Sequence, residues 1–248
     1  MTFCIAMKIE AGLVGIADTA ITTGFEKITA KKYSIFERDG HSMFVMTSGL
    51  RSARDKALTY FEEVIESEDE EFDKLYKAVN AFATQVRRVA SEDKAPLEES
   101  GLPFNLNCII GGQLEKDKEH KLYLLYPQGN WVEVSQGTPY YVIGESAYGK
   151  PLLDRALRFD TDMSTALKIG VLAFDATRKA ATDVGYPIDV VWYLKDSFKI
   201  HTHRYKGEDL RPVAQWWQER LRKSIDELPS DWIELAMQPR KQNVTPLK

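Results

Sequence analysis

The sequence is poor in the side chains that form disulfides or hold metal ions. Its 248 residues include two cysteines, Cys4 and Cys108, and four histidines. Both cysteines lie within apolar runs, so we expect buried thiols rather than a disulfide, in agreement with a reducing compartment. The few Cys and His residues form no cluster with the spacing of a zinc site. The sequence therefore predicts no structural metal.

Long apolar runs and a strong charge of one sign are also absent. No run approaches the length of a membrane-spanning helix. Lys8 and Glu10 interrupt the apolar start, which excludes the hydrophobic region of a signal peptide. The formal net charge of −4 argues against a dedicated nucleic-acid surface. We therefore expect a cytoplasmic protein that binds neither a membrane nor nucleic acid.

Apolar patterning along the chain separates strands from helices. Residues 2–47 contain strand-like runs, and two amphipathic helices follow within 51–90, with apolar side chains three and four residues apart. Strand-like runs resume over 105–144, two helices occupy 151–182, and a strand pair occupies 188–205. This order, without a break in composition, predicts an α+β fold in the form of a four-layer αββα sandwich of two mainly antiparallel sheets.

Two polar stretches are predicted as loops, and the end of the chain as a separate tail. The loops are the Thr/Gly-rich stretch before Lys31 and residues 91–103. A last amphipathic helix at 209–227 completes a single domain over 1–227. The tail, 228–248, is a candidate assembly contact because Trp is favoured in interfaces. The alternative is that Trp216, in this helix, and Trp232, in the tail, complete a core face.

The first residues of the chain contain a candidate catalytic site. Removal of Met1 leaves Thr2 with a hydroxyl and a free α-amine, and the amine can act as the base for the hydroxyl. An α-amine titrates at about 7.7–8.0, and a neighbouring ammonium lowers that pKa. Lys32 could supply the ammonium, with Asp18 as its counter-ion. A buried edge hairpin with a capping threonine and a surface lysine pair is the alternative.

The spacing of these residues resembles that of a proteasome β-type subunit. The resemblance rests on Thr2, Ala17-Asp18-Thr19, Lys31-Lys32 before an apolar strand, and Thr47-Ser48-Gly49. Two further segments are similar to the bacterial ancestral β-subunit family, Anbu: Met1-Thr2-Phe3-Cys4 and Ile143-Gly144-Glu145-Ser146-Ala147-Tyr148-Gly149-Lys150-Pro151. The similarity covers the chain to about residue 227.

The resemblance implies an N-terminal-nucleophile (Ntn) hydrolase that cleaves peptide or amide bonds. Thr2 would attack the carbonyl, and Asp18 would hold Lys32 beside the α-amine. The Gly49 amide would face the oxyanion, and Asp183 would orient the amine. The chemistry needs neither cofactor nor metal. The family further implies a homo-oligomer, a ring or a spiral of many subunits, and leaves an ATPase or an amide-ligase-type protein as an unidentified partner.

Two positions depart from the proteasomal pattern. The turn that reads Gly-Ser-Gly in proteasomes reads Gly144-Glu145-Ser146 here, and Tyr186 replaces the supporting serine three residues after Asp183. On sequence alone, Asp183 also fits a helix cap or a surface residue. The departures keep two alternatives open: a weakly active or inactive scaffold subunit, and a small-molecule Ntn amidase that uses the same residues.

Overall fold

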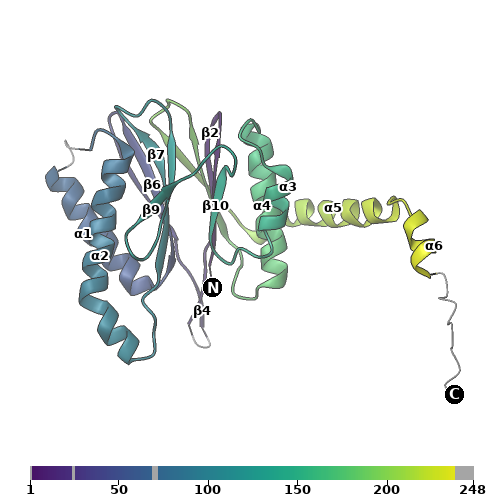
Figure 1. Ribbon diagram of the computed structural model, residues 1–248, viewed down its shortest axis with the longest axis horizontal. Helices are drawn as coiled ribbons and strands as arrows, with labels where there is room; N and C mark the ends of the chain where they lie inside the picture. Colours follow the sequence, from purple (N-terminus) through teal and green to yellow (C-terminus); the bar gives the residue numbers. More distant parts are fainter. Residues whose placement is uncertain (1, 24–25, 69–71, 238–248) are drawn as a thin grey trace, which may run out of the picture. The chain divides into compact units, whose positions relative to one another are not determined.

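The architecture is a sandwich of two sheets between two helical layers. The computed structural model describes residues 2–23, 26–68 and 72–237. It divides into two compact units, one up to Gly207 and one from Glu208. In the first unit, two five-stranded antiparallel sheets pack against each other, with helices on both outer faces (Figure 1). The predicted four-layer αββα fold is therefore confirmed.

The first sheet has the strand order β10-β1-β2-β11-β12. Its strands are β1 (Phe3–Ile9), β2 (Gly12–Asp18), β10 (Tyr140–Gly144), β11 (Ile188–Leu194) and β12 (Ile200–Tyr205). Every residue of β1 and β2 is buried. These two strands read as nearly continuous apolar runs because one face of the sheet contacts helices and the other face contacts the second sheet.

The second sheet has the order β5-β6-β7-β8-β9. Its strands are β5 (Tyr33–Arg38), β6 (His41–Gly49), β7 (Leu106–Leu114), β8 (Lys121–Leu125) and β9 (Trp131–Glu133). A separate hairpin consists of β3 (Ala20–Thr23) and β4 (Glu26–Thr29). The chain passes from the first sheet to the second through this hairpin, in the stretch between Asp18 and Tyr33.

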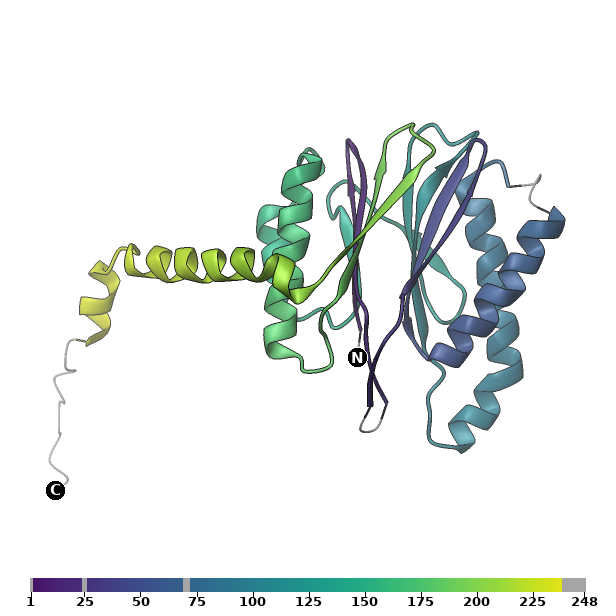
Figure 2. The same cartoon turned by 180° about the vertical axis from the view of Figure 1, so that it is seen from behind.

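Two pairs of helices cover the outer faces of the sheets. Helices α1 (Arg51–Glu68) and α2 (Leu75–Glu99) cover the second sheet, and α3 (Lys150–Ala156) and α4 (Met163–Ala180) cover the first (Figures 1 and 2). One buried cluster lies between α1, α2 and the second sheet. Within it, the rings of Phe61 and Phe82 meet edge to face, with centroids 5.2 Å apart.

The second unit, which begins at Glu208, contains most of one long helix and a short one. Helix α5 spans Gly207–Asp226 and helix α6 spans Asp231–Met237. Within α5, Leu210 and Ala214 are buried, whereas Trp216 is exposed, as is Trp232 in α6. The single domain predicted over residues 1–227 ends one residue after α5, whereas the packing divides the chain after Gly207. Residues 238–248 of the predicted tail lie outside the described residues.

Two predicted loops were wrong. The stretch 91–103 continues α2 as far as Glu99, because its Ala, Glu and Lys residues favour a helix and Pro96 lies near the helix end, where it removes one hydrogen bond. Gly101 follows the helix with φ of 75°, a conformation in which helices commonly end. The Thr/Gly-rich stretch before Lys31 forms the β3–β4 hairpin, since its β-branched residues suit strands.

We expect Phe82→Ala to lower the free energy of unfolding by about 3–5 kcal/mol, because it leaves a cavity beside Phe61 in a fully buried cluster. Urea denaturation followed by circular dichroism measures this change. Tyr76→Ala, on the same helix but 39% exposed, is the control and should cost at most about 1 kcal/mol. Equal losses in the two variants would contradict the assignment of the core.

Candidate functional site

A cavity of about 390 Å³ opens beside Thr2. It lies where the ends of strands from both sheets meet: Thr2 precedes β1, Gly144 ends β10, Gly49 ends β6 and Leu106 begins β7. Three residues of the predicted site line it, namely Thr2, Lys32 and Gly49. The other lining residues are Ala20, Ile21, Thr47, Ser48, Arg51, Arg54, Asn105, Leu106 and Gly144.

A buried ion pair holds Lys32 at the wall of the cavity. Its Nζ lies 2.6 Å from Asp18 Oδ1 and donates a second hydrogen bond to the Ala20 carbonyl oxygen at 2.8 Å. The Phe3 amide N–H donates to the same Asp18 oxygen at 2.8 Å. Asp18 is fully buried and Lys32 is 3% exposed. Burial raises the pKa of Asp18, while the Lys32 ammonium and the Phe3 N–H oppose the rise.

The backbone of Thr2 is held by the end of β10. The Glu145 amide donates to the Thr2 carbonyl oxygen at 2.7 Å, and Phe3 pairs with Gly144 across the antiparallel ladder. Gly144 adopts φ of +87°, and a Cβ there would lie 1.9 Å from the Thr2 oxygen. The Gly-Glu turn therefore requires glycine at this position, because no side chain fits so close to Thr2.

Gly49, like Gly144, adopts a backbone conformation that favours glycine. Its φ is +127°, and an added Cβ would lie 2.0 Å from the Asn105 carbonyl oxygen. The same oxygen accepts a hydrogen bond from the Leu50 amide at 2.8 Å, which fixes the turn between β6 and α1. The peptide of Gly49 thus reaches the cavity wall at the end of a strand, in the turn that the sequence pattern indicated.

The structure does not bring every predicted residue to the cavity. Asp183 is half-buried in the loop between α4 and β11 and is not among the described residues that line it. Glu145 turns its carboxylate back to the Ala147 amide at 3.1 Å. Tyr186 packs edge to face against Phe174, with ring centroids 5.0 Å apart. The two side chains that depart from the proteasomal pattern are thus engaged in other contacts.

Sequence reasoning missed three polar residues of the cavity: Arg51, Arg54 and Asn105. Arg51 and Arg54 lie three residues apart at the start of α1 and therefore share one face of the helix. Their position, which begins two residues after Gly49, was a usable signal. Asn105 precedes β7 and reaches the site only because β6 and β7 pair, with Gly49 opposite Leu106.

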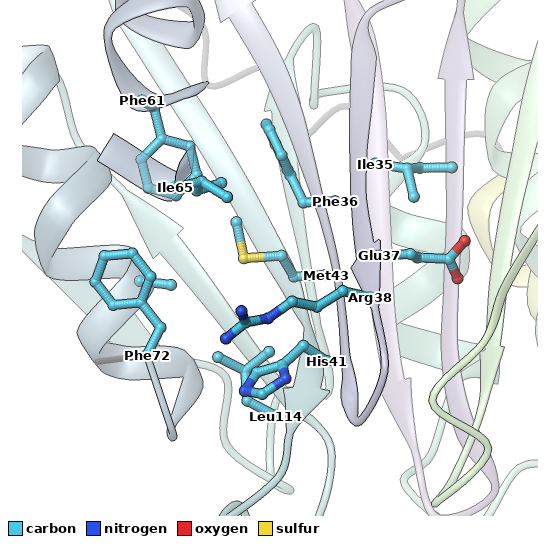
Figure 3. A pocket seen from close by; sticks show the side chains of 11 residues that line it. Ile35, Phe36, Glu37, Arg38, His41, Met43, Phe61, Ile65, Phe72 and Leu114 are labelled. Atoms are coloured by element: carbon cyan, nitrogen blue, oxygen red, sulfur yellow. The ribbon is translucent and has the colours of Figure 1, made fainter. Parts of the chain in front are cut away.

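A second cavity, of about 280 Å³, lies between the β5–β6 hairpin and the helices α1 and α2. Figure 3 shows Phe36, Met43 and Phe61 directed toward one another there, with Arg38 and His41 beside Leu114. None of its described lining residues carries a hydroxyl or a thiol, and none belongs to the predicted site. The cavity beside Thr2 is therefore the better candidate for nucleophilic chemistry.

Among the described residues, no group of three or more His, Cys, Asp or Glu side chains could hold a metal ion. None of the helices within these residues has both the length and the apolar character needed to cross a bilayer.

Comparison with known proteins identifies the family of the chain. A search of curated proteins gives no match. Among solved structures, the chain is similar to a Gly-1 mutant of Anbu from Hyphomicrobium sp. strain MC1, with 30% identity over 92% of this chain and 99% of that one and a TM-score of 0.84. Anbu from Yersinia bercovieri is 28% identical, covering 92% and 97%, with a TM-score of 0.84.

A helical assembly of the Anbu complex from Pseudomonas aeruginosa is 27% identical to the chain, covering 97% of this chain and 100% of that one, with a TM-score of 0.86. The family model for proteasome subunits matches residues 2–193, which include Thr2, Asp18, Lys32 and Gly49. The chain therefore belongs to the proteasome subunit family and, within it, to the ancestral β-subunits called Anbu.

Proposed function

We propose that the chain is an N-terminal-threonine hydrolase that cleaves peptide or amide bonds. The observation that carries the proposal is the cavity that Thr2, Lys32 and Gly49 line together, with Lys32 held by the buried Asp18. An N-terminal threonine supplies nucleophile and base from one residue. The site therefore needs only a positive charge beside the amine and a backbone donor for the oxyanion, and neither requires a cofactor.

The reaction follows from these roles. After removal of Met1, which lies outside the described residues, the Thr2 hydroxyl attacks the substrate carbonyl and its proton passes to the α-amine. The Gly49 N–H stabilises the negative charge on the carbonyl oxygen. The C–N bond then breaks as the ammonium returns the proton to the leaving amine, which leaves an ester on Thr2. Water, deprotonated by the α-amine, hydrolyses the ester and regenerates the threonine.

Lys32 acts in this scheme through its charge. A fixed ammonium near the Thr2 amine disfavours a second positive charge and lowers the pKa of that amine, so more of it is the free base near neutral pH. Asp18 keeps the lysine in place. Asp183, which we place as a residue that orients the amine, would have to act from outside the cavity lining, so we expect its contribution to be smaller than that of Lys32.

We also propose that the protein works as a homo-oligomer of many subunits joined head to tail. The related Pseudomonas aeruginosa protein is described as a helical assembly. Head-to-tail contacts between identical subunits close into a ring or continue as a spiral. The exposed Trp216 and Trp232 supply apolar surface of the kind that subunit contacts use. Enclosure within such an assembly would keep an open threonine site away from other proteins.

A scaffold subunit with a silent threonine is the second candidate. The positions of Asp183, Glu145 and Tyr186 favour it, because none of these side chains is among the described residues that line the cavity. Amide hydrolysis needs a very large acceleration, so a site with few supporting contacts turns over slowly. Measured reactivity at Thr2 separates the two candidates.

We expect a β-lactone to acylate Thr2, and Thr2→Ala to abolish that labelling while it leaves the fold intact, because the hydroxyl of this partly exposed residue contributes little packing. Intact-mass spectrometry reads both the acyl adduct and the loss of Met1. Thr2→Ser is the control and should keep the label. Equal labelling of Thr2→Ala, or a chain that retains Met1, would contradict the mechanism.

Lys32→Ala should lower kcat/KM by about a hundredfold or more, because the charge beside the amine is lost. It should also destabilise the fold by about 3–5 kcal/mol, since Asp18 would be left buried without its partner. Lys31→Ala is the matched control, because Lys31 is exposed and its Nζ lies 5.5 Å from the centre of the Tyr33 ring. Peptide-cleavage kinetics and urea denaturation measure the two effects, and the reverse ranking would show that the wrong lysine is assigned.

Deletion of residues 229–248 should shift the protein from large assemblies toward smaller species, because it removes the exposed Trp232 and Met237. Analytical ultracentrifugation and electron microscopy at micromolar concentration measure the distribution. A full-length protein that sediments as a 28.3 kDa monomer would exclude the proposed assembly.

A further inference from the structure

The cavity beside Thr2 carries an excess of positive charge. Its charged lining residues are Lys32, Arg51 and Arg54, and no described Asp or Glu lines it. Asp18 balances the charge of Lys32. The two arginines share one carboxylate, that of Asp55, which Arg54 contacts at 2.6 Å and Arg51 only at 3.4 Å. Three cations face two carboxylates, so one positive charge is left without a counter-ion in this group.

The place of the arginines on their helix is electrostatically unfavourable. Arg51 is the first residue of α1, and the first turn of this helix contains no acidic residue. The N-terminus of a helix carries partial positive charge and favours Asp or Glu, so cations there destabilise the helix end. An anion bound in the cavity would relieve this repulsion. Two features therefore favour a negatively charged ligand: the excess of positive charge in the cavity, and the location of the arginines at the N-terminus of α1.

The two arginines differ in their freedom to move. Arg54 is fixed, because its Nη1 donates to the Lys31 carbonyl oxygen at 3.2 Å and its side chain is only 14% exposed. The Arg51 side chain is 57% exposed, and its contact with Asp55 is long, at 3.4 Å. Arg51 can thus turn toward a ligand while Arg54 contributes a fixed field. A guanidinium binds a carboxylate with two parallel hydrogen bonds, which no ammonium can match.

We infer that the site selects substrates with a carboxylate side chain next to the bond that Thr2 attacks, that is, peptides or amides of glutamate or aspartate. The inference rests on the proposed function, because it names the substrate class of the same site. The apolar residues Ala20, Ile21 and Leu106 suit the methylene groups of such a side chain. Arg51 binds the carboxylate, and Arg54 adds to the attraction.

A binding measurement tests the inference without requiring turnover. Two fluorescein-labelled, C-terminally amidated tetrapeptides, Ala-Ala-Ala-Glu and Ala-Ala-Ala-Gln, differ in one charge and hardly in shape. Fluorescence anisotropy with the full-length Thr2→Ala protein, which cannot react, gives their dissociation constants. We expect the Glu peptide to bind about tenfold more tightly, and the preference to shrink as salt is raised.

Variants of α1 connect the preference to Arg51. Arg51→Gln should bring the two dissociation constants close together, and Arg51→Glu should reverse the preference. Lys56→Gln is the matched control: Lys56 is on the same helix, its Nζ contacts Glu92 and Asp93, and it does not line the cavity. This variant removes the same unit of charge and should keep the preference for the Glu peptide.

Failure of the inference and failure of the proposed function give different results. Equal binding of the two peptides by Thr2→Ala, or no binding of either at millimolar concentration, overturns the inference, whether or not a β-lactone labels Thr2. Preferential binding of the Glu peptide together with an unlabelled Thr2 in the unmodified protein supports the carboxylate site and overturns only the hydrolase.

Discussion

The ion pair between Asp18 and Lys32 connects the parts of the structure on which the site depends. Asp18 ends β2 in the first sheet, and Lys32 lies just before β5 in the second. The Asp18 carboxylate also accepts a hydrogen bond from the Phe3 amide. It therefore connects the start of β1 to the end of β2 and to Lys32. Buried charges are costly unless they are paired, and either partner alone would destabilise the fold. The pair therefore specifies how the two sheets meet at the cavity.

Close backbone approaches complete the edge that the ion pair organises. Gly144 brings the end of β10 against the Thr2 carbonyl, and Gly49 brings the end of β6 against the Asn105 carbonyl. At both positions a Cβ would clash with backbone that cannot yield. Thr2 and the Gly49 turn, which is expected to bind the oxyanion, are thus held by main-chain contacts at the ends of strands. Such contacts position a site more precisely than flexible loops do.

Helix α1 contributes to the core and to the site with different faces. Ala53, Ala57 and Phe61 are buried against the second sheet, which fixes the orientation of the helix. That orientation leaves Arg51 and Arg54 at the cavity, next to the Gly49 turn. The charge of the cavity therefore follows from how the helix packs. Two residues of the same helix, Phe61 and Ile65, also line the second, mainly apolar cavity at the other end of the β5–β6 hairpin.

Local patterns in the sequence determined the elements and the outline of the site. The strand pair predicted over 188–205 is observed as β11 and β12, and the spacing of Thr2, Lys32 and Gly49 indicated residues that line one cavity. The continuation of α2 past residue 91 was missed because Pro96 outweighed the helix-forming residues around it. Only the tertiary structure decided that Asn105 joins the cavity while Asp183 does not line it. Which strand and helix ends meet depends on the packing of segments far apart in the chain, and no local periodicity carries that information.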